Sequence, residues 1–264
     1  MPTTRLTKLP PEARAAIEQH TGPVFKDEMV SSGLNSEIAA RVHTQSGTFF
    51  VKGLTTGHRR VWTQAREEAI NPYIRHLGPA ILWHPHTPEW DLIVFEDIPG
   101  SHADYSPGSP DLEHITAALT NLAHTPCPPV PLKPMTERMA DYTGGGDLSL
   151  FAGEHLLHTD WNPHNALITD RAHLVDWAWA ARGAAWIDPA LWVIWLIRSG
   201  HPAPQAEQWG AKTRAWRDAP PHALDLFASA QRRLWNKIAG TGPDPWTRAM
   251  QQAAMAWDHH RRSV

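Results

Sequence analysis

The stretch 156–176, LLHTDWNPHNALITDRAHLVD, constrains this 264-residue chain more than any other. After the polar loop 159–164, a short apolar run at 166–168 meets the turn-forming pair Asp170-Arg171, and a second apolar run at 173–175 follows. Two short apolar runs joined by turn residues are typical of a β-hairpin. We therefore expect the polar residues at the two ends of this hairpin to lie close together.

A two-residue turn would place Asn165 opposite Asp176. Directly opposed residues on one face of a hairpin have Cβ atoms about 4.5–5.5 Å apart, near enough for both side-chain oxygens to reach one cation. Magnesium takes a few oxygen ligands and completes its octahedron with water and phosphate oxygens. Asn165 and Asp176 are therefore the predicted Mg²⁺ ligands, although a three-residue turn would change this register. Asp160, on the preceding loop, is the predicted acceptor of a proton from an incoming hydroxyl group.

This pattern resembles a known family. The spacing His158-x-Asp160-x-x-x-x-Asn165, followed by an apolar strand ending in Asp176, is similar to the catalytic loop and metal-binding aspartate of protein kinases. The sequence Asp176-Trp177-Ala178 in place of D-F-G indicates a closer resemblance to the aminoglycoside phosphotransferase family. The resemblance implies an α+β class with a bilobal protein-kinase-like fold, which has a small β-rich N-lobe and a larger, mostly helical C-lobe.

The resemblance also implies two supporting residues for the catalytic loop. His158 would be a buried, hydrogen-bonded residue that braces the loop, and general-base work would fall to Asp160. Asp188 matches a family aspartate that ties the loop down. A helix cap before Pro189 explains Asp188 almost as well, and both interpretations stay open.

Composition limits the class of protein. The chain is 42% hydrophobic and 19% charged with a net charge of −3, which argues against a disordered tail and gives no indication of nucleic-acid binding. Cys127 is the single cysteine and cannot form an internal disulfide. The first ten residues lack the apolar core of a signal peptide, and the longest apolar run, 190–197, is too short to cross a bilayer. We expect a cytoplasmic protein with no membrane or nucleic-acid partner, and the oligomeric state stays open.

The first part of the chain, 1–98, is predicted to be a nucleotide-binding lobe. A helix at 12–20 is followed by strands at 24–30, 37–44 and 48–54, a helix at 58–77 bent near Pro72, and strands at 80–83 and 92–96. In such a lobe the turn at 31–36 would lie over the phosphates, and Lys52 would be the lysine carried by the third strand. The turn has only Gly33 and departs from the kinase glycine pattern, so side chains could donate hydrogen bonds to the phosphates instead: Ser31, Ser32, Asn35 and Ser36.

Two further nucleotide contacts follow from the resemblance. Glu67 would pair with Lys52 and hold it toward the phosphates, with Glu68 as the less favoured partner. Backbone groups from Glu96 to Ile98 would hydrogen-bond the adenine edge. Each residue also has an ordinary explanation, because Ser, Gly and Asn are common in turns and charged helix residues are mostly solvated.

The second part, 99–264, is predicted to be the catalytic and acceptor-binding lobe. It contains a helix at 111–124, a proline-rich connection at 125–136 and helices at 203–218, 222–239 and 245–260. In the family this last region builds the acceptor site. The resemblance and the hairpin geometry together imply transfer of the γ-phosphoryl group of ATP or GTP, with Mg²⁺, to a hydroxyl group of an aminoglycoside-like or other small hydroxylated molecule.

Two other classes stay open. A catalytically silent nucleotide-binding protein would share the fold, and the departure of the 31–36 turn from G-x-G-x-x-G favours it. A metallohydrolase would instead use His158, Asp160 and His164 as ligands of a transition metal.

Overall fold

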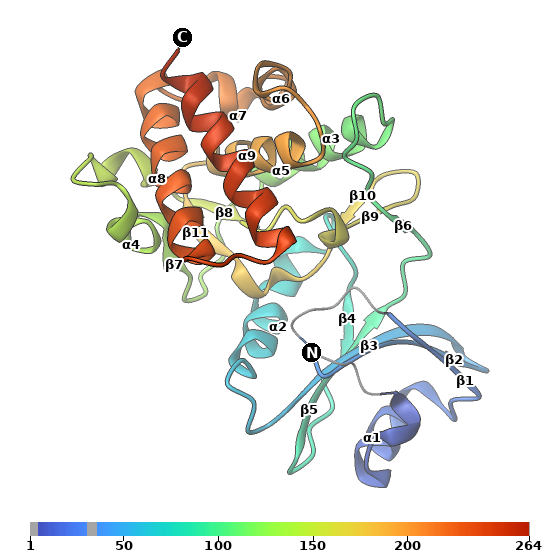
Figure 1. Ribbon diagram of the computed structural model, residues 1–264. Helices are drawn as coiled ribbons and strands as arrows, with labels where there is room; N and C mark the ends of the chain where they lie inside the picture. Colours follow the sequence, from blue (N-terminus) through green and yellow to red (C-terminus); the bar gives the residue numbers. More distant parts are fainter. Residues whose placement is uncertain (1–4, 31–35, 264) are drawn as a thin grey trace. The chain divides into compact units, whose positions relative to one another are not determined.

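The computed structural model describes residues 5–30 and 36–263 (Figure 1). The chain divides into two compact units. The first contains Met1–Gly100 and His173–Ala178, and the second contains Ser101–Ala172 and Trp179–Val264. The predicted boundary after residue 98 does not anticipate that six residues beyond the hairpin turn belong to the first unit.

The first unit is built on a five-stranded sheet in the order β1-β2-β3-β5-β4, with antiparallel neighbours. Its strands correspond to the predicted apolar runs, and the described connection between β2 and β3 falls at the predicted turn, Gln45 and Ser46. The elements are η1 (Leu6–Lys8), α1 (Pro11–Thr21), β1 (Lys26–Met29), β2 (Ile38–Thr44), β3 (Gly47–Thr55), α2 (Trp62–Ile74), β4 (Ile81–Trp83) and β5 (Trp90–Glu96).

The alternation of side chains along β3 decides which residues enter the core. Val51 lies between Ala40 and Val94 and is fully buried in a cluster that η1 and α1 complete with Leu6, Leu9, Ala13 and Ile17. Because successive side chains of a strand point to opposite faces, Lys52 projects from the other face of the sheet. The hydrophobic face thus holds α1, and the opposite face carries the lysine.

A short segment of the C-terminal half, 173–178, packs into the first unit through backbone contacts. The Leu174 N–H donates to the Leu77 carbonyl oxygen over 2.7 Å. A Cβ added at Gly78 would collide with the carbonyl oxygen of Leu174. Glycine at 78 therefore permits the close approach that brings Asp176 into this unit.

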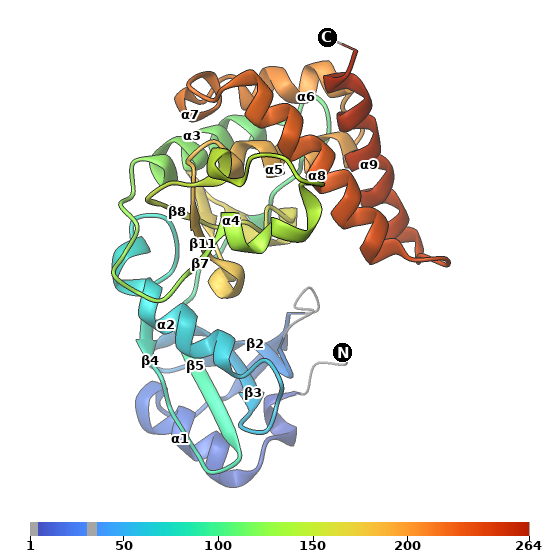
Figure 2. The same ribbon diagram turned by 90° about the vertical axis from the view of Figure 1, so that its left-hand side faces the viewer.

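The second unit is mostly helical. The buried helix α5 contacts α6 and α9, and α8 and α9 lie side by side and run in opposite directions (Figures 1 and 2). Aromatic rings fill the space between helices: Phe151, Trp186 and Phe227 contact one another with ring centroids 5.4–5.9 Å apart. The helices are α3 (Asp111–Ala123), α4 (Met135–Arg138), η2 (Ala140–Tyr142), η3 (Leu148–Phe151), η4 (Pro163–Asn165), η5 (Trp177–Trp179), α5 (Ile187–Arg198), α6 (Ala203–Gly210), α7 (Arg214–Arg217), α8 (Pro221–Ala239) and α9 (Pro245–Arg261), with η5 beginning in the first unit.

Short strands in this unit frame the catalytic-loop sequence. A sheet in the order β7-β11-β8 leads into the loop, because β8 ends at Leu157. After the loop, β9 pairs antiparallel with β6. The strands are β6 (Ser101–His102), β7 (Lys133–Pro134), β8 (His155–Leu157), β9 (Ala166–Ile168), β10 (Ala172–Leu174) and β11 (Ala181–Gly183), with β10 ending in the first unit.

Three local predictions need correction. The expected two-residue turn is wrong, because three residues, Thr169–Arg171, connect β9 to β10, and the Thr169 N–H donates to the Arg171 carbonyl oxygen over 2.9 Å. The predicted helix 203–218 is two helices, α6 and α7, separated by a cap at which Thr213 accepts the Trp216 N–H. Helix α2 is shorter than 58–77 and keeps Pro72 inside it. In the described part of the chain, every helix is too short or too polar to span a membrane.

Candidate active site

The first half of the candidate site is an ion-pair cluster on the polar face of the β3 strand. Lys52 Nζ lies 2.5 Å from Glu67 Oε1 and 3.0 Å from Asp176 Oδ1. Lys52 and Glu67 are buried, with side chains 9% and 4% exposed. Buried charges are tolerated when they are paired and hydrogen-bonded. The three side chains therefore fix one another in place.

The protonation of this cluster follows from burial and mutual charge. Burial alone would lower the pKa of Lys52, but the neighbouring carboxylates of Asp176 and Glu67 raise it above its ordinary value. Burial raises the pKa of Glu67 to about 7, against the opposing effect of the Lys52 ammonium. The lysine is thus held as a cation, which is the state that attracts phosphate oxygens.

The other predicted nucleotide-binding residues lie in the 31–36 turn and in the 96–98 segment. Ser31, Ser32 and Asn35 lie outside the described residues, and Ser36 is 3% exposed. The Glu96 N–H donates to the Ala80 carbonyl oxygen, and the Ile98 carbonyl oxygen accepts the Gly100 N–H. These two backbone groups of the 96–98 segment are therefore already used within the sheet edge and its following turn.

In the second unit, Asp188 is bonded to the loop that carries Asp160. Its carboxylate accepts the backbone N–H groups of His158 and Thr159, and the indole N–H of Trp161, each over 2.9 Å. Asp188 is the second residue of α5 and the cap position is Trp186, so the helix-cap interpretation is wrong. Burial raises the pKa of Asp188, while the Trp161 indole, the charge of His158 and the loop N–H groups oppose that shift.

Arg138 and Thr159 add a support that sequence reasoning missed. Arg138 Nη1 donates to Thr159 Oγ1 over 2.7 Å and to the Trp179 carbonyl oxygen over 2.9 Å. Thr159 has a φ of 66°, a conformation that costs a β-branched residue about 1–2 kcal/mol. The hydrogen bonds to Asp188 and Arg138 offset this strain. No local signal in the sequence links Arg138 to a residue 21 positions further on.

The loop itself orients the proposed catalytic groups. The Asp160 N–H donates to His158 Nδ1 over 3.3 Å, and the Asn162 N–H donates to Asp160 Oδ1 over 3.4 Å. Asn165 Nδ2 donates to the Asp160 carbonyl oxygen over 3.1 Å, so Oδ1 is the amide atom through which Asn165 would ligate a cation. His158 is 1% exposed and packs on Trp161, which suits a bracing role.

Asp176 has an unusual backbone conformation. Among the described residues, Thr159 and Asp176 are the non-glycine residues with positive φ, 66° and 61°. Residues held in this region outside glycine cluster at functional sites, and aspartate tolerates it better than most residues. Asn165 belongs to η4 rather than to a strand. The predicted pairing of Asn165 with Asp176 joins the two units and stays a prediction.

The metallohydrolase interpretation finds no support in the described residues. His158, Asp160 and His164 do not form a group of ligand atoms close enough to hold one metal ion. Instead, the His164 ring packs edge-on against the His102 ring, with centroids 4.7 Å apart. The histidines of this loop thus serve packing and hydrogen bonding.

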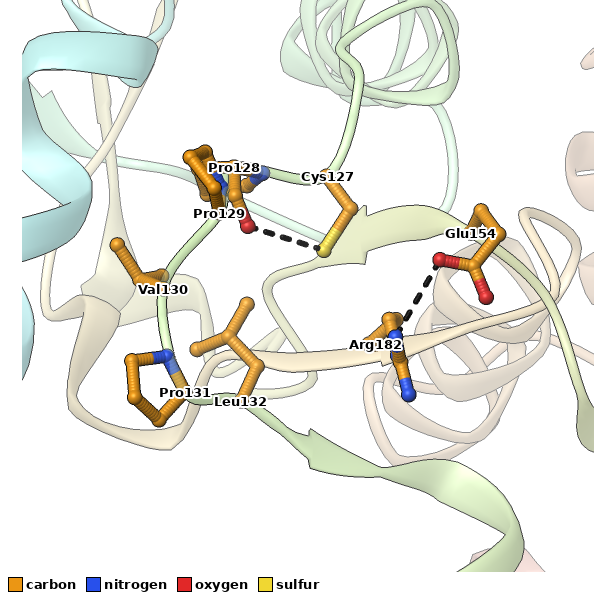
Figure 3. A pocket seen from close by; sticks show the side chains of 8 residues that line it. All are labelled: Cys127, Pro128, Pro129, Val130, Pro131, Leu132, Glu154 and Arg182. Carbon is orange, nitrogen blue, oxygen red and sulfur yellow. Dashed lines mark hydrogen bonds and ion pairs between the residues drawn. The ribbon is translucent and has the colours of Figure 1, made fainter.

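A separate pocket of about 400 Å³ opens beside the proline-rich connection (Figure 3). Arg182 Nη1 lies 3.4 Å from Glu154 Oε2, and burial raises the pKa of the Cys127 thiol, which makes it a poor nucleophile. Glu154 precedes β8 and His158 follows it, so the pocket lies at the opposite end of that strand from the catalytic loop. The pocket is lined by Cys127, Pro128, Pro129, Val130, Pro131, Leu132, Glu154 and Arg182.

The chain resembles known proteins in its three-dimensional structure. No protein-family model matches the sequence, and no curated protein matches it. The aminoglycoside phosphotransferase APH(4)-Ia is similar in structure, with a TM-score of 0.63, 14% identity, and coverage of 95% of this chain and 98% of the other. The fold is that of the aminoglycoside phosphotransferases. The predicted kinase-like fold is therefore confirmed.

Two further solved structures show the same fold. Choline kinase LicA from Streptococcus pneumoniae has a TM-score of 0.64 and 12% identity, with 96% of this chain and 100% of that chain covered. A thermostable mutant of APH(4)-Ia in a ternary complex with AMP-PNP and hygromycin B has a TM-score of 0.64 and 14% identity, with 96% and 99% covered. The aminoglycoside phosphotransferase fold thus accommodates acceptors of different chemistry.

Proposed function

We propose that this protein is a small-molecule kinase, which transfers the γ-phosphoryl group of ATP or GTP to a hydroxyl group of a small acceptor. The observation that carries the proposal is the contact of Lys52 with both Glu67 and Asp176 on the polar face of the sheet. A buried lysine braced by a helix glutamate and facing an aspartate is the arrangement that kinases use to bind nucleotide phosphates. Together with Asp160 and Asn165 of the catalytic loop, this arrangement argues against a catalytically silent protein.

Lys52 has the clearest role in this proposal. Its ammonium group is held as a cation, and Glu67 restricts the directions in which its four-carbon side chain extends. A fixed cation binds phosphate oxygens with less loss of side-chain entropy than a mobile one does. Lys52 would therefore position the nucleotide phosphates and neutralise part of their charge.

Asp160 would orient the acceptor hydroxyl and accept its proton. Its position is fixed by the hydrogen bonds of the loop to Asp188 on one side and to Asn165 on the other. A general base must be held within hydrogen-bond reach of the proton that it removes. Rigid attachment of the loop supplies this condition, because Asp188 is itself buried in α5.

Asn165 and Asp176 would hold Mg²⁺. A carboxylate and an amide oxygen suit this hard cation, which prefers oxygen ligands. When bound, Mg²⁺ neutralises charge on the transferring phosphoryl group. The Asp176 carboxylate also lies 3.0 Å from the Lys52 ammonium, so the proposed metal ligand and the proposed phosphate-binding lysine are neighbours.

The acceptor is a small hydroxylated molecule in this proposal. The structural neighbours include a complex with hygromycin B and a choline kinase. The direct test is to incubate the purified protein with ATP or GTP and Mg²⁺ together with aminoglycosides, choline or simple sugar alcohols. Release of nucleoside diphosphate and the mass of the acceptor would be measured for each pair.

Asp160→Asn is the matched control for this test. We expect nucleotide binding to persist and acceptor-dependent turnover to fall by about 10²–10⁴-fold, because the variant keeps the shape of the side chain but cannot accept the proton. Retained turnover would remove Asp160 from its role. Nucleotide binding with no transfer to any acceptor would favour the silent nucleotide-binding protein, and absence of nucleotide binding would overturn both.

A further inference from the structure

A cluster of two histidines and an aspartate lies at the connection between β4 and β5, outside the residues used in the proposed reaction. His84 and His86 follow β4, and Asp91 lies in β5. An antiparallel bridge places His86 opposite Asp91, and the Leu92 N–H donates to the Pro85 carbonyl oxygen over 3.1 Å. Because residues two apart in an extended segment share a face, His84 and His86 both project toward Asp91.

The ligand atoms of the cluster are close together. His84 Nε2 lies 2.7 Å from Asp91 Oδ1, and His86 Nδ1 lies 3.7 Å from Asp91 Oδ2. One ligand atom from each residue lies within 4.8 Å of the others. Ligands of a tetrahedral Zn²⁺ are about 3.3 Å apart, given metal–ligand bonds near 2.0 Å. The side chain of His86 is 60% exposed and can make the small movement required.

Two neighbours on α2 orient the cluster. Glu68 Oε2 lies 2.8 Å from His84 Nδ1, and the side chain of His84 is only 7% exposed. Gln64 Nε2 donates to the Asp91 carbonyl oxygen over 2.8 Å and also to Asp91 Oδ1. Metal-binding histidines usually donate their second ring N–H to a carboxylate, which fixes the tautomer and the ring orientation. Glu68 lies within reach of that role: its carboxylate is at ion-pair distance from His84 Nδ1, and a small rotation would bring the two into hydrogen-bond geometry, which they do not have in this structure.

We propose that His84, His86 and Asp91 form a Zn²⁺ site, in which Glu68 orients His84. Two imidazole nitrogens and one carboxylate oxygen suit a borderline divalent cation, whereas Mg²⁺ prefers oxygen ligands alone. The bound ion would join the β4–β5 connection to α2 through the contact between His84 and Glu68. Since Glu67 is the adjacent residue, the ion would also stabilise the helix that holds Lys52.

The test uses full-length protein without a polyhistidine tag, from which metals have been removed with a chelator. Calorimetric titration with Zn²⁺ should show a single tight site in the wild type. His86→Ala and Asp91→Asn should each weaken this site by about 100-fold or more, which exceeds the loss expected for an outer partner. Glu68→Gln should weaken it by roughly 10–100-fold. His222→Ala removes an exposed histidine of α8 and should leave binding unchanged.

Two further measurements separate a ligand from a merely structural residue. Titration with Co²⁺ should give a visible absorption band in the wild type that is lost in His86→Ala and in the more conservative His86→Gln. Zn²⁺ should raise the unfolding temperature of the wild type but not of these variants. Any change in unfolding temperature with Mg²⁺ should be the same in the wild type and the variants, because Mg²⁺ should not bind at this site. Equal Zn²⁺ affinity in the wild type, His86→Ala and His86→Gln, or no tight Zn²⁺ site in the wild type, would overturn the proposal.

Discussion

Lys52 Nζ donates a hydrogen bond to Asp176 Oδ1 over 3.0 Å, although 124 positions separate the two residues in the chain. Asp176 reaches this position because the segment 173–178 packs into the first unit, where the Leu174 N–H bonds to Leu77 and Arg66 Nη1 donates to the Ala178 carbonyl oxygen over 3.5 Å. The proposed metal ligand and the proposed phosphate-binding lysine therefore belong to one compact unit. Disturbing either residue should affect the other.

The adjacent acids Glu67 and Glu68 provide a matched pair of variants. Glu67→Gln should lower the free energy of unfolding by roughly 1–3 kcal/mol, because it weakens a charged hydrogen bond to a buried ammonium group. It should also weaken nucleotide binding. Glu68→Gln, at a side chain that is 52% exposed, should leave both properties nearly unchanged in metal-free buffer. Chemical denaturation and nucleotide titration would check this, and equal effects of the two variants would contradict the assignment of Glu67.

Asp176 can be tested without disturbing its backbone. Asp176→Asn keeps a side chain that tolerates a φ of 61°, whereas alanine would add strain there. We expect the variant to lose most of the increase in unfolding temperature that nucleotide gives in the presence of Mg²⁺. The smaller increase without Mg²⁺ should persist, because Lys52 keeps its contact with Glu67. If the variant responds to Mg²⁺-nucleotide as the wild type does, Asp176 is not a metal ligand.

Asp188 is expected to act on catalysis through the loop. Asp188→Asn should cost roughly 2–5 kcal/mol of folding free energy, since an amide cannot accept all the N–H groups that the carboxylate accepts. Turnover at temperatures where the variant is folded should also fall, with little change in nucleotide affinity. The control is Asp258→Asn, which removes the charge of a buried carboxylate that contacts Arg232 and the exposed Arg262 in the helical region. That variant should lose stability without a comparable loss of turnover.

His102 should make stability depend on pH. Burial of the ring, and then the charge of His164, lower the pKa of His102 below its ordinary value of 6.5. The unfolded chain therefore binds a proton more readily, so this contribution to stability is present above pH 6.5 and is lost as the pH falls through the lower folded-state pKa.

His102→Gln should make the unfolding temperature depend less on pH between about 7.5 and 5.5. Thermal unfolding at a series of pH values would check this, and a slope equal to that of the wild type in His102→Gln would contradict it.

Local sequence patterns predict much of the fold. The apolar runs of the first unit predict its strands, and the proline and glycine positions predict the ends of α1, α8 and α9 within one or two residues. The errors fall where local signals compete. The Asp170-Arg171 pair does not specify a turn type, and the connection from β9 to β10 takes three residues rather than two.

The sequence by itself determined the local content of the catalytic loop. His158, Asp160 and Asn165 lie within eight positions of one another, so their spacing restricts their arrangement before any tertiary contact forms. Only the tertiary structure decided which glutamate reaches Lys52. Consecutive helix residues point about 100° apart, and the packing of α2 against the sheet turns Glu67 inward and Glu68 outward. The tertiary structure also placed Asp176 beside Lys52 and Asp188 against the catalytic loop, because contacts between distant residues depend on how the elements pack.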